Sequence, residues 1–359
     1  IRFLLICKRY YINKDLLVDR YGRNFELPVR LGELGHKGFV LAADYRRADV
    51  EPFEERGIRF ESSRLSVTRP LEFFRRSREA VRSLAPEVII ASGDTHLGLL
   101  GMVVARLHGV PFVFDVYDNY EAFASARIPG MKWIFRFVVR RANLVLCVST
   151  ALARKLRPLT DRTLVIGNGV DPTVFYARDR RAARETLGIG ADEKVVIYVG
   201  GITDTRGVRE LIDAIGLLVG DGIAIRLLIV GRNQSSFDLG EPWVDYRGVV
   251  PHDRVPVYLS AADIAVLPYL PDEWGTYTHP TKLAEYMACG VPVVATEILG
   301  YREIDTLSGI RWCQPGDVGA MKSAILDQLT QPLPTDGPFG LLWEDYVRRL
   351  DRGLAQIRR

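Results

Sequence analysis

The stretch Pro280-Thr-Lys-Leu-Ala-Glu285-Tyr-Met-Ala-Cys-Gly290-Val-Pro292-Val-Val-Ala295 describes a helix that passes directly into a strand. Proline is favoured in the first turn of a helix, and glycine just beyond its last turn. We therefore predict a helix from Pro280 to the residue before Gly290, followed by a strand over Val291–Ala295. The N-terminus of such a helix carries unpaired N–H groups and a partial positive charge, which suit a phosphate. Lys282 lies in this first turn, and Glu285, one turn later, can reach the same end.

Short apolar runs alternate with amphipathic helical patterns on both sides of this stretch. Runs that are apolar on both faces and separated by helices are typical of parallel strands covered by helices on both sides. We therefore expect an α/β fold with two Rossmann-like, doubly wound domains. The first series of expected strands is Arg2–Ile6, Gly38–Leu41, Glu87–Ala91, Phe112–Val116, Leu144–Val148 and Thr163–Ile166, and the second is Val195–Val199, Ala224–Val230, Val244–Tyr246, Ile264–Leu267 and Val291–Ala295.

The chain has 359 residues, a length that suits two domains. The cluster of turn formers Gly167-Asn-Gly-Val-Asp-Pro172 is the expected linker. We predict an N-terminal, acceptor-side domain over residues 1–170 and a donor-binding domain over residues 171–335. A break rich in proline and glycine, Gln331–Gly340, precedes an amphipathic tail. We expect residues 336–359 to form a C-terminal helix that packs back on the first domain, where its apolar face finds a partner.

The composition indicates an ordinary globular protein: 48% of the residues are hydrophobic, 26% are charged, and the formal charge is +4. No apolar run approaches the ~18 residues of a membrane span, and the N-terminus shows no secretory pattern. The four cysteines show no C-x-x-C spacing and the five histidines no H-x-x-x-H spacing. These patterns argue against a zinc site and a disulfide framework, and predict a cytoplasmic protein without a bound metal.

Together with Ser260-Ala-Ala-Asp263-Ile-Ala-Val-Leu-Pro268 upstream, the stretch from Pro280 resembles the GT-B glycosyltransferases of family GT4. The family pattern reads roughly S-x-A-D-x-x-x-x-P, then P-x-K-x-x-E-y-M-A-x-G-x-P-V-V. The resemblance covers nearly all of the second domain, and in the first only the architecture and a few loops. It implies two Rossmann-like domains that face each other across a cleft. Further matching segments are Asn168–Asp171 with Phe175, Tyr198–Gly201 with Arg206-Gly207, Val230-Gly231, Arg247–His252 and Val255–Leu259.

The resemblance implies a retaining glycosyltransferase that moves a sugar from a nucleotide-sugar donor to a hydroxyl acceptor, such as a glycan, a lipid-linked sugar or a small molecule. It places Glu285 at the ribose of the donor. His279 is expected beside the donor sugar or its β-phosphate, with a capping or packing role as the alternative. The other expected donor-binding residues are Gly200, Gly201, Arg206 and Lys282 at the diphosphate, Arg232 with the backbone of Val249 and Val250 at the base, and the helix residues Pro280, Thr281 and Leu283.

Arg206 and Lys282 also imply a reaction without metal. Two fixed cations and a helix N-terminus can neutralise a leaving diphosphate, which Mg²⁺ does in other transferases. The chain also lacks a D-x-D motif at the expected place. We therefore expect no cofactor, a UDP- or GDP-sugar as co-substrate, and a catalytic group formed by Arg206, Lys282 and Asp118.

The sequence departs from the family pattern at three places. Tyr277 stands where many members carry a second glutamate that contacts the donor sugar. Tyr117 stands where many members carry a histidine. The loop Asp19–Asn24 contains one glycine, Gly22, in place of a glycine pair. Gly22 either brings backbone close to a donor phosphate or makes a tight turn before a helix over Asn24–Leu34. The absence of G-x-G-x-x-G argues against a dinucleotide oxidoreductase.

Acidic residues follow two expected strands of the first domain. Ligands of open α/β sheets bind beyond the carboxyl ends of the strands. We therefore expect an acceptor site here, in which Asp118 orients the acceptor hydroxyl. The alternative for a single acid at a strand end is a helix cap. The residues expected on the acceptor side are Asp94, His96, Asp115, Tyr117 and Glu121.

Two segments, Arg69–Arg82 and Lys132–Arg141, combine basic and aromatic residues. One interpretation is peripheral contact with an anionic membrane at its inner face, which would suit a lipid-linked acceptor. The other is a pair of helices with an apolar core face and a solvated basic face. No nucleic-acid-binding motif accompanies the charge, so we expect no nucleic-acid partner.

Two other functions fit the same sequence. A GT-B-fold sugar-nucleotide epimerase would bind the same donor and need no acceptor. A catalytically inactive, donor-binding partner subunit is conceivable because Tyr277 replaces the family glutamate.

Overall fold

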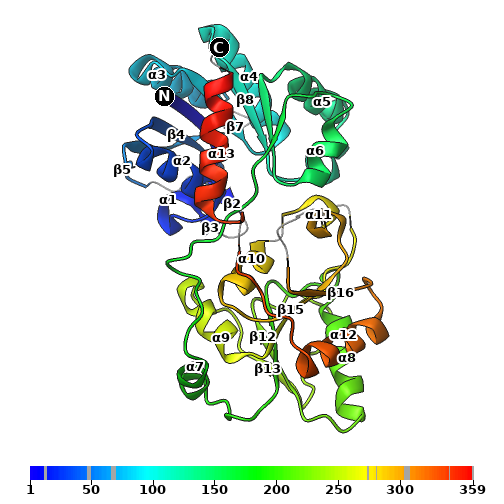
Figure 1. The fold of residues 1–359 in the computed structure, drawn as a ribbon. Coiled ribbons are helices and arrows are strands. Elements are labelled where there is room, and N and C mark those ends of the chain that lie inside the picture. The colour runs from blue at the N-terminus through cyan, green and yellow to red at the C-terminus, as the bar shows by residue number, and fades with distance from the viewer. Residues whose placement is uncertain are drawn as a thin grey trace. The chain divides into compact units, whose positions relative to one another are not determined.

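The computed structural model describes residues 1–11, 14–46, 50–65, 70–272, 275–279, 281–302, 308–338 and 340–357, and divides into two compact units (Figure 1). Unit 1 comprises Ile1–Asn168, Tyr277–His279 and Trp343–Arg359, and unit 2 comprises Gly169–Thr276 and Pro280–Leu342. The division falls two residues before the predicted domain boundary. Residues 336–342, which we predicted as part of the C-terminal segment, belong to unit 2.

Unit 1 is built on an eight-stranded sheet of order β10-β9-β8-β7-β1-β4-β6-β5, in which only β5 runs antiparallel to its neighbour. The chain winds outward from β1 in one direction and then, from β7, in the other. This reversal is the arrangement of a doubly wound sheet. The strands are β1 Arg2–Lys8, β4 Lys37–Asp44, β5 Phe53–Glu55, β6 Ile58–Arg64, β7 Val88–Ser92, β8 Phe112–Val116, β9 Leu144–Cys147 and β10 Thr163–Val165.

Helices cover both faces of this sheet because its strands are apolar on both sides. In β1, Leu4 and Ile6 join a core with α3 to α6, whereas Phe3 and Leu5 face residues of α2 and α13. The helices are α2 Arg23–Glu33, α3 Pro70–Leu84, α4 Thr95–His108, α5 Met131–Arg141, α6 Thr150–Leu156 and α13 Trp343–Gln356, with the shorter elements α1 Leu16–Asp19, η1 Tyr120–Ala122, η2 Ala124–Arg127 and the hairpin β2 Tyr10–Tyr11 and β3 Lys14–Asp15.

The C-terminal helix α13 lies in unit 1 beside α2 (Figure 1). Two ion pairs join it to unit 1: Arg30 Nη1 to Glu344 Oε1 at 2.5 Å, and His36 Nε2 to Asp351 Oδ1 at 3.0 Å. Its apolar residues are buried at helical spacing, which explains why a segment so distant in sequence belongs to unit 1. The buried apolar residues of α13 are Trp343, Tyr346, Val347, Leu350 and Leu354.

Unit 2 contains a six-stranded, wholly parallel sheet of order β13-β12-β11-β14-β15-β16. This is the strand order of a dinucleotide-binding fold, with the reversal between β11 and β14. The α/β prediction of two doubly wound domains is therefore confirmed. The strands are β11 Val195–Val199, β12 Arg226–Val230, β13 Val244–Tyr246, β14 Ile264–Leu267, β15 Val293–Thr296 and β16 Ile310–Cys313. The helices are α7 Arg180–Leu187, α8 Val208–Gly220, α9 Val255–Ala261, α10 Thr281–Ala288, α11 Leu299–Arg302 and α12 Val318–Thr330, with the turn η3 His252–Arg254. The turn η4 Gly275–Tyr277 begins in unit 2 and ends with a residue of unit 1.

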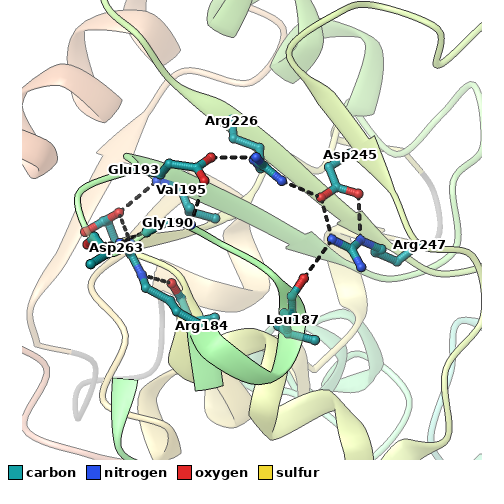
Figure 2. Close-up of polar contacts among 11 residues, drawn as sticks. Arg184, Leu187, Gly190, Glu193, Val195, Arg226, Asp245, Arg247 and Asp263 are labelled. Carbon is teal, nitrogen blue, oxygen red and sulfur yellow. Dashed lines mark hydrogen bonds and ion pairs between the residues drawn. The ribbon is translucent and has the colours of Figure 1, made fainter. Parts of the chain in front are cut away.

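A partly buried polar network ties α7 to the amino ends of the unit 2 strands (Figure 2). Arg184 donates from Nη2 to Asp263 Oδ2 at 2.9 Å and from Nε to the carbonyl of Ala261 at 3.0 Å. The same Asp263 oxygen accepts from the backbone N–H of Val195 at 2.8 Å, at the start of β11. Asp263 belongs to a motif on which the family resemblance was based, and its place here is structural: it fixes β11 and α7 together.

None of the helices within the described ranges is both long and apolar enough to cross a membrane.

Candidate active site

Two loops leave the carboxyl ends of β11 and β14, where the strand order of unit 2 reverses. The first contains Gly200 and Gly201, and the second begins with Pro268. Gly207, which precedes α8, has φ +69°, and a Cβ there would collide with the carbonyl oxygen of Pro268. The two loops therefore pack backbone against backbone. A doubly wound fold binds its ligands at such a reversal, so the structure offers a site where the sequence predicts the donor diphosphate.

The loop after β11 packs closely against neighbouring residues of unit 2 at Gly200, whereas its backbone at Gly201 is exposed. The hydroxyl of Tyr198 donates to the carbonyl of Gly201 at 2.8 Å. A Cβ on Gly231, which has φ +148°, would collide with the carbonyl oxygen of Gly200. Gly201 itself is exposed, and a Cβ there would meet no atom within 4 Å. Backbone at Gly201 is thus accessible to a ligand without displacing a side chain.

Arg206 is a half-buried cation in this loop, and no carboxylate within the described ranges forms an ion pair with it. Its guanidinium carbon lies 4.6 Å from the centre of the Tyr269 ring, on the loop after β14. Burial opposes the charged form, but Tyr269, Tyr198, Tyr301 and Asp272 together outweigh it, so that the net shift in the pKa of Arg206 is upward. A fixed positive charge with no protein counterion suits an anionic ligand.

Helix α10 presents Lys282 and Glu285 as a pair, with Lys282 Nζ donating to Glu285 Oε2 at 2.8 Å. Glu285 is 2% exposed, and His252 Nε2 lies 3.6 Å from its other oxygen. Burial raises the pKa of this carboxyl, and the nearby Lys282 and His252 lower it by more, so that the net shift is downward. Glu285 is therefore an ionised, oriented acceptor for hydrogen bonds, as ribose recognition requires.

His252 is a member of this site that the sequence analysis did not select. It lies in the turn η3, contacts Glu285, and packs edge-on against the ring of Phe175 with centroids 5.0 Å apart. Both residues belong to segments that we matched to the family. The match to the family therefore included His252. Its contact with Glu285 could not be predicted, because the two residues are 33 positions apart in the sequence.

The remaining donor-side residues lie on the loops of unit 2 or on α10. Arg232 and Val249 are exposed, Val249 by 67%, and Val250 and Thr281 are half-buried. Leu283 is completely buried, so that its side chain packs in the core of unit 2. Pro280 lies outside the described residues.

Tyr277 and His279 lie in unit 1, which corrects their predicted place in the second domain. The hydroxyl of Ser149 donates to the carbonyl of Tyr277 at 2.7 Å, and Lys155 Nζ lies 4.8 Å from the centre of its ring. His279 Nε2 and the Tyr346 hydroxyl form a hydrogen bond of 2.8 Å. Burial, followed by the charge of Arg23, lowers the pKa of His279 to about 3, so the ring is neutral at physiological pH.

Two of the predicted acceptor-side carboxylates have structural partners. Both oxygens of Asp115 are occupied: Arg23 binds them from Nε and Nη2 at 2.7 to 3.2 Å, and Ser92 Oγ donates to Oδ2 at 2.7 Å. Glu121 pairs with Arg136 at 2.9 Å and with Lys155 at 3.3 Å. These contacts explain both residues without a ligand.

The other acceptor-side residues gather near the carboxyl ends of β1, β7 and β8. Asp94 Oδ2 lies 2.5 Å from Lys8 Nζ, and His96 Nε2 forms a hydrogen bond of 2.8 Å with the Tyr45 hydroxyl. Tyr117 is buried, with the ring of Tyr11 edge-on at 5.4 Å. Asp118 is buried, and its Oδ1 accepts from the backbone N–H of Asn119 at 2.8 Å.

Gly22 is the residue before α2 and has φ +87°, a conformation that favours glycine. It therefore makes the tight turn that the sequence suggested as one alternative. A Cβ on Gly22 would meet no atom within 4 Å, so the backbone here is open to a ligand.

Nucleophilic cysteine chemistry finds no support in the structure. All four thiols are buried, and burial raises the pKa of each, to about 12 for Cys147 and Cys289 and about 11 for Cys313. Within the part of the chain that the structure describes, no three His, Cys, Asp or Glu side chains converge as metal ligands would.

Family models match both halves of the chain. One described as "Glycosyl transferases group 1" matches residues 193–331, and one described as "Glycosyl transferase 4-like domain" matches residues 26–169. The chain belongs to the GT4-like, group 1 glycosyltransferases. The family expected from the sequence is thus confirmed, and the protein is a transferase.

Named relatives of this glycosyltransferase agree. The putative teichuronic acid biosynthesis glycosyltransferase TuaC of Bacillus subtilis is 27% identical over 338 residues, which span 88% of this chain and 82% of that protein. The gpi3 subunit of phosphatidylinositol N-acetylglucosaminyltransferase from Schizosaccharomyces pombe is 24% identical, over 87% of this chain and 71% of that protein.

Solved structures confirm the GT-B fold of the glycosyltransferase. Sucrose-phosphate synthase from Thermosynechococcus elongatus aligns with a TM-score of 0.70 at 19% identity, over 99% of this chain and 96% of that one. HepE from Anabaena, in complex with UDP, aligns with a TM-score of 0.71 at 16% identity, over 100% of this chain and 97% of that one. At these identities the likeness establishes the fold alone.

The ribose assignment of Glu285 gives a direct prediction. We expect Glu285→Gln to weaken UDP or GDP binding by about 10- to 100-fold, because hydrogen bonds to charged groups contribute about 1.5–3 kcal/mol. Isothermal titration calorimetry measures this affinity. The matched control is Glu185→Gln, whose side chain is 68% exposed on α7 and pairs with Arg181 of the same helix. If both variants bind nucleotide like the parent protein, Glu285 does not contact the ribose.

Proposed function

We propose that this glycosyltransferase uses a nucleotide-sugar donor, binds its diphosphate at the strand reversal of unit 2, and transfers the sugar with retention and without a metal ion. The observation that supports this most is the half-buried Arg206, a cation with no ion-pair partner in the described ranges, at the carboxyl edge of a doubly wound sheet. The Lys282–Glu285 pair on α10 adds a second cation and a ribose acceptor. Because related HepE structures were solved in complex with UDP and with UDP-glucose, a UDP-sugar is the first donor to test, followed by GDP-sugars.

Arg206 and Lys282 would stabilise the leaving diphosphate. As the bond between the sugar C1 and the phosphate oxygen breaks, negative charge develops on the diphosphate, and fixed cations in a partly buried site stabilise it strongly. The neutral His279 could donate one hydrogen bond but adds no charge. Glu285 would hold the ribose hydroxyls and so keep the diphosphate in register with both cations.

Retention is best explained by displacement on one face of the sugar. A covalent intermediate would need a carboxylate nucleophile at the opposite face. The segment Trp274–Lys282 contains no acidic residue, and Tyr277 stands where the family glutamate would be. We propose instead that the acceptor oxygen bonds to C1 on the face that the diphosphate leaves. The departing phosphate oxygen takes the acceptor proton, and Asp118 of unit 1 assists in orienting the reacting hydroxyl.

Product analysis tests this function. Purified protein is incubated with a UDP-sugar, with and without acceptor sugars. Nucleotide release that depends on acceptor, with a product whose anomeric configuration by NMR matches the donor, supports the proposal. An isomerised donor would indicate an epimerase, nucleotide binding without turnover would indicate an inactive partner subunit, and an inverted product would overturn the mechanism.

We also propose peripheral contact with an anionic membrane. Of the two basic segments, which form α3 and α5, we assign this contact to α5. In α3, Phe73 is completely buried and Phe74 packs on the core. In α5, Trp133 is 66% exposed and stacks on Phe137 with centroids 5.5 Å apart. The same helix also carries exposed basic residues. Exposed aromatic and basic side chains together are typical of a helix that lies on a bilayer. The exposed basic residues are Lys132, Arg136, Arg140 and Arg141.

Vesicle binding tests the α5 surface. We expect co-sedimentation with phosphatidylserine vesicles at low salt, and loss of binding at high salt as screening removes the attraction. Trp133→Ser should lower the partition coefficient about tenfold, because one large apolar side chain no longer leaves water. Leu71→Ser, on α3 and 76% exposed in the parent protein, is the control and should change little. Equal loss in both variants, or no binding at low salt, would contradict this role of α5.

A further inference from the structure

The strand order of unit 1 reverses between β1 and β7, and an ion pair marks this point. Lys8 ends β1, and Asp94 follows β7 by two residues. Their Nζ and Oδ2 atoms lie 2.5 Å apart, with side chains 19% and 13% exposed. In unit 2 the corresponding reversal carries the proposed diphosphate site. By the same rule for doubly wound sheets, the acceptor is expected to bind at this edge of unit 1.

Asp94 has the position of a helix cap but does not cap its helix. It is the N-cap residue of α4, yet its side chain accepts no hydrogen bond from the first turn. Other N-cap side chains of this chain do accept such bonds, for example Ser149 in α6, Asp179 in α7 and Asp317 in α12. A cap contributes about 1 kcal/mol, so the carboxylate of Asp94 forgoes a favourable contact. The alternative of a simple helix cap, left open by the sequence, is thus removed.

One oxygen of this carboxylate has no partner. Oδ1 of Asp94 is buried and accepts no hydrogen bond from any described residue. A buried acceptor that lacks a donor costs about 1–3 kcal/mol, and native structures supply a partner to nearly all such atoms. A hydroxyl group of a ligand would satisfy this oxygen while Lys8 holds the other.

The groups around Asp94 are polar and aromatic, and their charge is balanced. The charges of Lys8 and Asp94 cancel. Burial, ahead of the opposed effects of Asp94 and Lys8, lowers the pKa of His96, so this ring is neutral at physiological pH and is hydrogen-bonded to Tyr45. Asp94 also lies close enough to Tyr117 to contribute, after burial and Tyr11, to its raised pKa. Tyr11, 43% exposed, adds an accessible aromatic ring beside Tyr117.

This balance distinguishes the Asp94 cluster, formed by Lys8, Tyr45, Asp94, His96 and Tyr117, from the donor side. Recognition of a phosphate or carboxylate uses cations that the protein has not already neutralised, such as Arg206 in unit 2. The Asp94 cluster instead offers a carboxylate oxygen, an imidazole, hydroxyl groups and apolar rings. That combination suits a polyhydroxylated, uncharged ring.

We propose that the acceptor presents an uncharged sugar ring to the Asp94 cluster, and that Asp94 Oδ1 accepts a hydrogen bond from a hydroxyl adjacent to the reacting one. The inference rests on the proposed glycosyl transfer and specifies its acceptor class. Asp94 binds and selects the acceptor, and the proton of the reacting hydroxyl still leaves with the phosphate. Loss of the Asp94 carboxylate therefore weakens acceptor binding, whereas glycosyl transfer to the bound acceptor continues.

Direct binding tests the acceptor class without turnover. Saturation-transfer NMR and calorimetry are run with the methyl glycosides of glucose, galactose, mannose and N-acetylglucosamine, and with the uronides of the first three. We expect at least one neutral glycoside to bind, and to bind about tenfold or more tightly than its uronide, since the added carboxylate finds no free cation in the cluster. Tighter binding of a uronide, or binding of no neutral glycoside, would overturn the inference.

Variants then test the residue. Asp94→Asn should raise the acceptor KM about 10- to 100-fold with little change in kcat, the pattern of lost uniform binding. Asn is as good an N-cap as Asp, so α4 should persist, and an unchanged UDP affinity would show that the donor site is intact. Tyr45→Phe, which leaves the ion pair in place, should raise KM by a smaller factor. Asp161→Asn, on an exposed turn of unit 1, is the matched control.

The two proposals fail in different ways. If the parent protein binds UDP but transfers sugar to no acceptor, the proposed function fails. If it transfers sugar and Asp94→Asn leaves the acceptor KM unchanged, only the acceptor inference fails.

Discussion

Replacement of Arg206 by alanine should lower kcat/KM for glycosyl transfer by about 10²- to 10³-fold, the range for removal of one fixed group that stabilises developing negative charge. The guanidinium is half-buried, lies 4.6 Å from the centre of the Tyr269 ring, and pairs with no described carboxylate. Its loss thus removes a charge that serves no structural ion pair. Because the charge on the diphosphate grows as the sugar leaves, kcat should fall more than donor affinity. Steady-state kinetics with a UDP-sugar and calorimetry with UDP separate these two effects.

A second arginine, three residues further along the chain in the first turn of α8, provides the control. Arg209 lies on α8, its side chain is 57% exposed, and it pairs with Asp213 one turn later. Arg209→Ala removes the same charge from the same unit and should leave kcat/KM within about twofold, as expected of a surface pair. If Arg206→Ala and Arg209→Ala behave alike, the charge at the strand reversal does not act on the diphosphate. Circular dichroism of both variants should match that of the parent protein.

The sequence predicted the fold well wherever the strands are apolar on both faces. Phe112–Val116, Val195–Val199 and Ile264–Leu267 are buried strands with the predicted bounds. The half-exposed edge strand Val244–Tyr246 also has the predicted bounds. The sequence prediction missed β6, Ile-Arg-Phe-Glu-Ser-Ser-Arg, in which five of the seven residues are polar. This strand lies near the sheet edge, with β5 beyond it. The pattern of a covered central strand, which was the signal used, does not describe such a strand.

Long-range pairing was the part of the site that the sequence could not show. Asp115 and Asp94 look alike in sequence, since each is an acid at the end of a buried strand. Their difference comes from partners: Arg23, 92 residues away, occupies both oxygens of Asp115, whereas Lys8 occupies one oxygen of Asp94. The same holds for His279, whose partner Tyr346 is 67 residues distant on the C-terminal helix. Residue type and local spacing contain no information on such contacts.

The Arg23–Asp115 pair gives the largest expected effect on stability. Asp115→Asn should lower the free energy of unfolding of unit 1 by about 3–5 kcal/mol, because removing one partner of a buried pair leaves the other charge uncompensated. Both side chains are almost inaccessible, 6% and 4% exposed. Arg23 Nη1 also donates to the carbonyls of Ile166 and Gly167 at 2.7 and 2.8 Å, so the same guanidinium fixes the chain just after β10. Urea denaturation followed by circular dichroism measures the loss.

The surface pair of Arg20 and Glu55 is the matched comparison, since its atoms lie 3.5 Å apart and its side chains are 54% and 34% exposed. Glu55→Gln should cost less than about 1 kcal/mol, because water already solvates both charges. The two results together separate a structural from a catalytic role for Asp115. If Asp115 is structural, Asp115→Asn lowers the urea midpoint, while the folded protein at low temperature keeps its acceptor KM and its kcat. If turnover falls and the midpoint does not, Asp115 contacts the acceptor as the sequence first suggested, and the Arg23 pair must open when substrate binds.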